Sequence, residues 1–395
     1  MQIQFITAKN FKSLVDFRLD LAKFTCLIGL NGSGKSTVLQ FIDFIGQQVR
    51  GNIEGWLSER EWDTVDILSK FSSRPTVDFS VSLVASTGES DVTWGASFDT
   101  SKLYCTSEHI VTPGARLEVR DGRLRIEDLS ASDPAARNAI DERIAFSYQG
   151  SVLSQLKEET LPNSLIGFRN YFKTVKSLDL LSPERLRQRG REAAGSLGLG
   201  GQRLAAFLYE LGRESQHNIA RQLKKVYKQL DSINSRSLRS GWKQLEITET
   251  YKGKESGLLP RMTTEARHVN DGMLRLIAIL AGLEGSNGFL LFDEIENGIN
   301  PELVEMVVNT LLSARQQVLV TTHSPMILNF LEDSVARASV IYLYKTRPGH
   351  TQAIPFFSIP SLAKKLTVMG PGEAFVDTNL TDLADEISEV THAKV

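Results

Sequence analysis

The sequence predicts an α/β fold that carries an antiparallel β subdomain and an inserted helical lobe. Two apolar stretches, 24–28 and 289–292, are typical of buried parallel strands, and each is followed by residues suited to chemistry. Residues 75–130 alternate apolar and polar side chains as antiparallel strands do, whereas residues 150–235 have mainly helical spacing. We therefore expect three parts: an N-terminal lobe, a basic helical lobe and a C-terminal lobe, over 1–150, 151–245 and 246–395.

The N-terminal part begins with strand patterns and then changes to a helix. Residues 2–8 and 15–21 alternate as the two arms of a hairpin, which leads into the apolar strand 24–28. From Thr37 onward the apolar positions follow helical spacing. Farther along, the pair Asp121-Gly122 separates two alternating runs and predicts another hairpin.

The middle part is expected to be helical and compact. A stretch from about Gln202 to Ile233 has helical spacing, but its apolar positions do not hold a heptad repeat, so an extended coiled coil is not indicated. A strand near 245–251 follows. The chain then alternates helix and buried strand, with predicted elements at 274–283, 289–292, 303–314 and 318–321.

Composition excludes several broad classes of protein. The chain has 395 residues, 41% of them hydrophobic, and a net charge of −2, which fits an ordered globular protein of two to three units. Its two cysteines cannot form a disulfide framework. We find neither a secretory signal nor an apolar run long enough to span a membrane, and therefore expect a cytoplasmic protein with no membrane partner.

Residues 29–37 match the phosphate-binding pattern G-x-x-x-x-G-K-[ST] at every fixed position. In such a loop, backbone N–H groups surround phosphate oxygens, the lysine reaches the β and γ phosphates, and the hydroxyl after it ligates Mg²⁺. The strand before the loop and the helix after it favour this interpretation over a chance glycine-rich turn. The predicted fold is thus a P-loop NTPase, with Ser36 as a metal ligand. The candidate nucleotide-binding residues are Asn31, Gly32, Ser33, Gly34, Lys35, Ser36 and Thr37.

A second motif follows the buried strand 289–292, which ends in Asp293 and Glu294. A parallel strand delivers such carboxylates to the edge of the sheet where ligands bind. With a phosphate loop elsewhere in the chain, Asp293 is expected to hold Mg²⁺ and Glu294 to polarise the attacking water. A strand that merely ends in two solvated acids is the structural alternative.

These motifs and two further segments resemble the ABC ATPases. His323 follows the strand 318–321, where that family places the switch histidine that contacts the γ-phosphate. Residues 269–275 resemble the degenerate signature segment, often Leu-Ser-Asp-Gly-Thr-Leu-Arg, which completes the nucleotide site of an opposite subunit. The resemblance makes Asn270, Asp271 and Gly272 nucleotide contacts. Asn270 replaces the usual serine and could equally cap a helix.

Within the ABC ATPases the chain resembles the soluble OLD, RecF and SMC group. Residues 295–301 look like that group's D-loop, although a turn before a helix would give the same local pattern. The family's Q-loop glutamine, a metal ligand, would be Gln149, just before the helical lobe. Segments 10–13, 178–187 and 204–208 also look like this group.

The resemblance implies an enzyme that hydrolyses ATP with Mg²⁺, and a homodimer or higher homo-oligomer formed through the ATP interface. Its expected role is that of sensor or scaffold in a bacterial anti-phage defence system with a separate effector protein. OLD proteins carry a Toprim nuclease domain after the ATPase, but only about 70 residues follow His323 here. A transporter subunit fits less well, because the β subdomain and helical lobe do not suit one.

The alternative is a RecF-like or SMC-like ATPase of DNA repair or chromosome maintenance. Residues 151–245 contain 17 Lys and Arg against 8 Asp and Glu, and this excess would meet DNA. Such a run is also common on a solvated helical face. A salt-sensitive shift of duplex DNA would favour the alternative, and a stable partner protein would favour the defence role.

Overall fold

The centre of the fold is a six-stranded sheet, which confirms the predicted α/β class. A computed structural model describes residues 1–84, 91–130, 139–178, 182–251, 261–285, 288–381, 383, 386 and 387. The strand order is β10-β14-β15-β3-β16-β17, parallel throughout except for the β16–β17 pair. The strands are β3 (Phe24–Ile28), β10 (Lys176–Leu178), β14 (Phe289–Phe292), β15 (Gln317–Thr321), β16 (Val340–Lys345) and β17 (Thr351–Pro355).

Strands β3, β14 and β15 of this sheet are buried on both faces, which explains their largely apolar sequences. Phe289 and Leu291 of β14 belong to the core that contains helix α1 (Lys35–Arg50) and the N-terminal strands. Leu290 and Phe292 belong to the core on the opposite face, which contains α6 (Asp271–Glu284) and α7 (Pro301–Leu312). Alternate residues of one strand therefore join two separate cores.

The predicted antiparallel subdomain is an eight-stranded sheet of order β2-β1-β4-β5-β6-β7-β8-β9. The pair Asp121-Gly122 makes the expected hairpin between β7 and β8, and both residues have positive φ as this tight turn requires. The segment from Val152 to Val175 adds buried side chains to the same core. The strands are β1 (Gln2–Phe11), β2 (Leu14–Asp20), β4 (Thr76–Val84), β5 (Asp91–Asp99), β6 (Tyr104–Thr112), β7 (Ala115–Arg120), β8 (Arg123–Asp128) and β9 (Ala139–Arg143).

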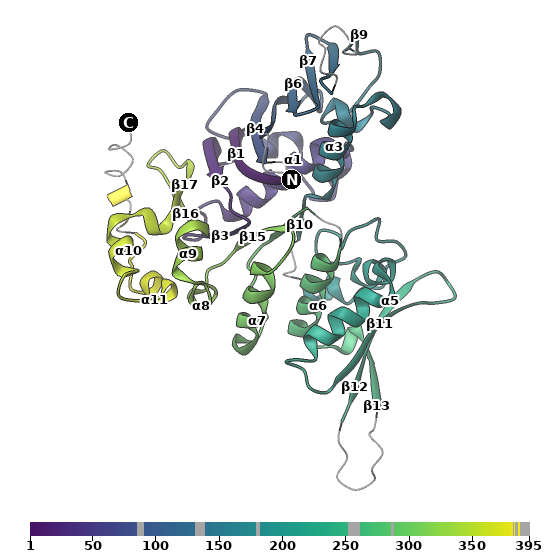
Figure 1. The fold of residues 1–395 in the computed structure, drawn as a ribbon, viewed down its shortest axis with the longest axis vertical. Helices are drawn as coiled ribbons and strands as arrows, with labels where there is room; N and C mark the ends of the chain where they lie inside the picture. The colour runs from purple at the N-terminus through teal and green to yellow at the C-terminus, as the bar shows by residue number, and fades with distance from the viewer. Residues whose placement is uncertain are drawn as a thin grey trace.

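The expectation of one helix from Gln202 to Ile233 was wrong in its second part. Helix α5 (Leu204–Leu223) kinks at Gly212 and ends ten residues before Ile233, and the chain then forms strand β11 (Leu230–Ser237). A shift of register between Leu230 and Ser232 puts Leu230 and Ile233 on one buried face, so their spacing of three imitates a helix. Strands β11, β12 (Lys243–Thr250) and β13 (Arg261–Glu265) form a third sheet, and β12 and β13 project from the body (Figure 1).

The remaining helices are short. Among the described residues, none of the helices is long and apolar enough to cross a membrane. Single 3₁₀ turns lie at Thr64–Ile67, Val152–Ser154, Glu158–Thr160, Ala266–His268 and Phe356–Ser358. The other α-helices are α2 (Ile53–Ser58), α3 (Asn163–Thr174), α4 (Pro183–Leu186), α8 (Pro325–Asn329), α9 (Asp333–Ser339), α10 (Pro360–Lys365) and α11 (Pro371–Val376).

Candidate nucleotide-binding site

The glycine-rich loop joins β3 to the N-terminus of α1, as its sequence predicts. Gly34 has φ 111°, a conformation that side chains disfavour, and a Cβ there would lie 2.4 Å from Thr351 Oγ1. The Lys35 ammonium donates hydrogen bonds to the carbonyl oxygens of Gly29 (2.9 Å) and Leu30 (3.2 Å). The lysine is therefore folded back over its own loop, where it lies among backbone groups that suit a phosphate.

Lys35 lies close enough to the carboxylates of the second motif to interact with their charges. The side chain is only 6% exposed. This burial lowers its pKa, while the negative charges of Asp293, Glu294 and Glu296 act in the opposite direction. The strand ends of β3 and β14 thus place the lysine and three acids in one electrostatic neighbourhood, although they lie more than 250 residues apart in the sequence.

The end of β15 fixes Asp293 and Glu294, the two acids of the second motif. Thr321 Oγ1 donates to Asp293 Oδ1 and accepts a hydrogen bond from the Glu294 backbone N–H at 2.8 Å. Glu294 has φ 44°, in the left-handed region that a residue with a side chain seldom adopts. Such strain is typical of functional sites, where the surrounding contacts hold the backbone in place.

His323 lies beside Glu294. Its Nε2 atom is 3.8 Å from Glu294 Oε1, and both side chains are partly exposed, at 38% and 33%. The backbone N–H groups of His323 and Ser324 both donate to Glu296 Oε1, at 2.9 and 3.1 Å. The geometry therefore joins the candidate base and the candidate switch residue at one accessible place.

Residues fit for Mg²⁺ also converge. Ser36 and Asp293 line one cavity of about 600 Å³. Mg²⁺ is usually held by one or two carboxylates, with waters and substrate phosphates as its other ligands, so a hydroxyl and one carboxylate suffice on the protein side. The described residues contain no group of three or more His, Cys, Asp and Glu that could hold a metal alone. The buried Ser33 Oγ has no hydrogen-bond partner there, which fits a loop that a phosphate oxygen completes.

Gln149 is not brought to this site. Its side-chain oxygen accepts a hydrogen bond from Glu54 N at 3.2 Å, and nearby Ser151 N donates to Gln48 O near the C-terminal end of α1. Ser36 lies at the opposite end of that helix, whose 16 residues span about 24 Å. We therefore correct the assignment of Gln149 as a metal ligand and drop it.

The signature segment includes the start of α6. Its residues Asn270 and Asp271, here called the signature tip, are exposed. Asn270 is the N-cap, and its side-chain oxygen accepts from Met273 N at 2.8 Å. This bond leaves the amide nitrogen as a donor. Asp271 is exposed and pairs with Arg187, and Gly272 lies so close to Gly298 that a Cβ would meet the Gly298 carbonyl at 2.8 Å.

Other residues of the Ser36–Asp293 cavity were not predicted from the sequence. They include Arg60, Arg185, Ser177 and Ser182. Ser177 belongs to β10, a strand of three residues that runs parallel to β14 and ends at the same edge of the sheet. A strand so short has no periodicity to detect. Of the segment 178–187 that resembles the OLD, RecF and SMC group, residues 179–181 lie outside the described part.

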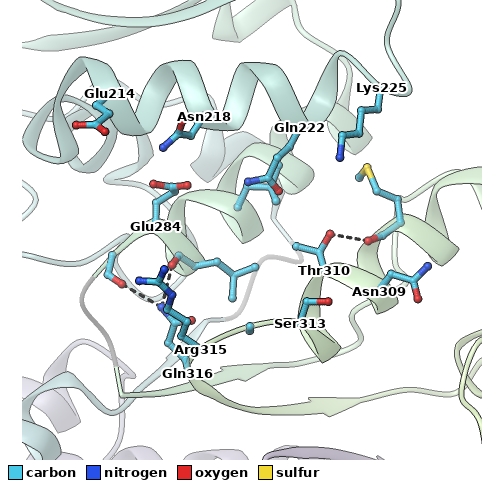
Figure 2. Close-up of a pocket in the computed structure, with 15 residues that line it drawn as sticks. Glu214, Asn218, Gln222, Lys225, Glu284, Asn309, Thr310, Ser313, Arg315 and Gln316 are labelled. Carbon is cyan, nitrogen blue, oxygen red and sulfur yellow. Dashed lines mark hydrogen bonds between the residues drawn. The ribbon is translucent and has the colours of Figure 1, made fainter.

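A larger hollow lies elsewhere. A cavity of about 1060 Å³ lies between α5, the end of α6 and α7, and most of the side chains that line it are polar, such as Asn218, Gln222 and Thr310 (Figure 2). None of the candidate nucleotide residues contributes to it. Of these two cavities, only the smaller one is lined by candidate residues, namely Ser36 from the start of α1 and Asp293 from the end of β14.

The fold and the loop geometry together define a P-loop NTPase fold of the ABC head type. Residues 1–92 match the family model described as "AAA ATPase domain". Residues 261–329, which contain the signature segment, both acids and His323, match the model "AAA domain, putative AbiEii toxin, Type IV TA system". Among curated proteins, none matches the chain significantly.

A solved structure of an SMC head domain shares this fold. An SMC head bound to the C-winged helix domain of ScpA is 14% identical, with a TM-score of 0.55 over 93% of this chain and 100% of that one. Two others are the head from Thermotoga maritima (12% identity, TM-score 0.45, 90% and 99% coverage) and a head with an extended coiled coil bound to the C-terminal domain of ScpA from Pyrococcus furiosus (12%, 0.49, 93% and 99%).

Proposed function

We propose that the chain binds and hydrolyses ATP and that two copies close around the nucleotide. The observation that carries this proposal is the convergence of Lys35 and Ser36 with Asp293 and Glu294 at one edge of the central sheet. A chance glycine-rich turn would have no reason to lie beside two acids from the other half of the chain. The AAA matches in both halves of the chain support the same assignment.

The side chains divide the reaction between them. Lys35 and the loop N–H groups bind the phosphates, and Ser36 and Asp293 hold Mg²⁺, which neutralises phosphate charge when bound. Glu294 orients water for in-line attack on the γ-phosphorus and accepts its proton. The bond to the β–γ bridging oxygen breaks, and its electron pair leaves with ADP. His323 lies beside Glu294 and contacts the γ-phosphate.

The proposed dimer follows from the accessible signature tip. Asn270 and Asp271 are exposed at the N-terminus of α6, where backbone N–H groups and the helix dipole favour an anion. Offered to a neighbouring copy, they would close over its γ-phosphate. Hydrolysis would then remove the phosphate that joins the two chains, so ATP controls association.

For the biological role we propose a sensor or scaffold ATPase in an anti-phage defence system, with a separate effector protein. Its support is the OLD-like sequence pattern and the match of residues 261–329 to a model whose printed description names a toxin and a type IV TA system. The test is to express the chain together with its neighbouring genes and to purify it. Recovery of a stable partner protein would support this role.

A DNA-maintenance role is the second candidate, and a surface patch favours it. Arg191 lies over the Trp242 ring (5.0 Å) and Lys243 over the Tyr209 ring (4.1 Å), with both aromatic rings partly exposed. Cations interleaved with aromatic side chains suit a nucleic acid. The double variant Arg191→Glu, Lys243→Glu should bind duplex DNA more weakly, and its binding should depend less on salt concentration. Unchanged binding would exclude this patch as a DNA-binding surface.

The assay for the ATPase itself is steady-state phosphate release with Mg²⁺. Lys35→Ala should abolish ATP binding and turnover, because the loop loses its only positive side chain. Lys23→Ala, at an exposed lysine just before β3, is the matched control and should match the unmutated chain. Normal turnover by Lys35→Ala would refute the site.

A further inference from the structure

The turn formed by residues 294–298 connects the catalytic acid to the rest of the site. Asn297 contacts Glu294 twice: its side-chain nitrogen donates to Glu294 Oε2, and its backbone N–H donates to the Glu294 carbonyl oxygen at 3.0 Å. One residue therefore holds both the main chain and the carboxylate of Glu294. Because that carboxylate is one-third exposed, packing alone does not fix its direction.

The other side of this turn rests on the signature helix. Arg275 is only 8% exposed, and its guanidinium donates to the Asn297 carbonyl oxygen. Next to it, Gly298 has φ 65°, and a Cβ there would lie 3.1 Å from Arg275 Nε, whereas a Cβ on Gly272 would lie 2.8 Å from the Gly298 carbonyl oxygen. The position of Asn297 is thus tied to the first turns of α6.

We propose that Asn297 is a positioning residue that aims the Glu294 carboxylate at the attacking water, and that its tie to Arg275 makes this aim depend on the signature segment of the same chain. The proposal rests on the proposed ATPase function and deepens it. In a dimer, the signature segment of one chain meets the nucleotide of the other. A shift of the signature segment would then change the orientation of Glu294 in the same chain, through Arg275 and Asn297.

Loss of Asn297 should change the geometry of the catalytic acid and not the binding of ATP. A general base must lie within hydrogen-bond reach of the water, and a displacement of about 1 Å can cost on the order of 100-fold in rate. Asn297 hydrogen-bonds the acid, and among the described residues none of its hydrogen bonds goes to the phosphate-binding loop, so its loss should lower kcat and leave KM for ATP in place. A merely structural residue would change both together or neither.

Three variants separate the hydrogen bond from the shape of the side chain. Asn297→Ala removes the amide, Asn297→Asp keeps its shape but replaces the donor with an acceptor, and Asn297→Ser retains a shorter donor. We expect kcat to fall about 10- to 100-fold in the first two variants and less in the third, with KM and ATP affinity within about twofold of the unmutated chain. Asn309→Asp, the same change on an exposed face of α7, is the control and should leave both constants unchanged.

A double variant tests whether Asn297 acts through Glu294. On a Glu294→Gln background, Asn297→Ala should add little further loss, because two residues that act as a unit are not additive. Full additivity, or an unchanged or raised kcat in Asn297→Ala and Asn297→Asp, would overturn the proposal. ATP-induced shifts of the melting temperature show that each variant is folded. If instead Lys35→Ala hydrolyses ATP normally, the proposed function itself fails.

Discussion

Gly34→Ala tests how the C-terminal strand supports the phosphate loop. A Cβ on Gly34 would lie 2.4 Å from Oγ1 and 2.9 Å from Cγ2 of Thr351, the first residue of β17. Thr351 cannot easily move aside, because it is fully buried and its hydroxyl bonds Ser33 O and Ser13 Oγ at 2.8 Å and accepts from Lys345 at 3.0 Å. The substitution must break these contacts or distort the loop.

The expected loss of stability has two sources. A side chain in the left-handed region costs about 1–2 kcal/mol, and overpacking a buried site costs about 1–3 kcal/mol. We therefore expect Gly34→Ala to lower the free energy of unfolding by about 3 kcal/mol. Urea denaturation followed by tryptophan fluorescence measures it, with the m-value showing that the same transition is compared.

A second substitution separates the two sources. Thr351→Ala deletes both clashing atoms, so in the double variant it should recover the overpacking part, about 1–3 kcal/mol, while the strain at Gly34 remains. The two substitutions should therefore be strongly non-additive. Additive effects, or a Gly34→Ala variant as stable as the unmutated chain, would refute the contact between the loop and β17.

Three other predictions concern buried charges. Asp43→Ala removes the α1 carboxylate that Arg50, Arg60 and Trp56 share, and should lower the free energy of unfolding, measured by urea denaturation, by about 3–5 kcal/mol. Burial raises the pKa of Glu108 from 4.5 to about 7, so the folded state binds more protons between these pH values. The free energy of unfolding, taken relative to Glu108→Gln, should fall by about 3 kcal/mol as pH rises from 4.5 to 7. Burial lowers the pKa of Lys12 to about 8, so the unfolded state binds more protons above that pH. Relative to Lys12→Met, urea midpoints should therefore rise between pH 8 and 10.5.

Local signals predicted the parts of the fold that are continuous in the sequence. The strand at 24–28, the helix after the glycine-rich loop and the strand at 289–292 lie where their patterns place them. The apolar runs of the two strands are unambiguous because both faces of each strand are buried. Strand β11 was missed because its bulge gives Leu230 and Ile233 a helical spacing.

The site was predictable only as far as its motifs are local. Short sequence patterns predict Lys35, Ser36, Asp293 and Glu294. Thr321, which hydrogen-bonds the Asp293 side chain and the Glu294 backbone, is an ordinary strand residue in the sequence. The sequence places Gln149 just before the helical lobe, and it lies at the wrong end of α1 because the chain between β9 and α3 contacts the C-terminal end of that helix. Contacts of this kind depend on tertiary packing, which the sequence pattern does not encode.

The central claim is that ATP joins two copies of this chain through Lys35 on one side and the signature tip on the other. The most direct measurement is the mass in solution of Glu294→Gln, with and without ATP and Mg²⁺, by light scattering. We predict one chain without ATP and an assembly of at least two with it, and no such change when Lys35→Ala is added. A Glu294→Gln chain that binds ATP and keeps the same mass would contradict the account.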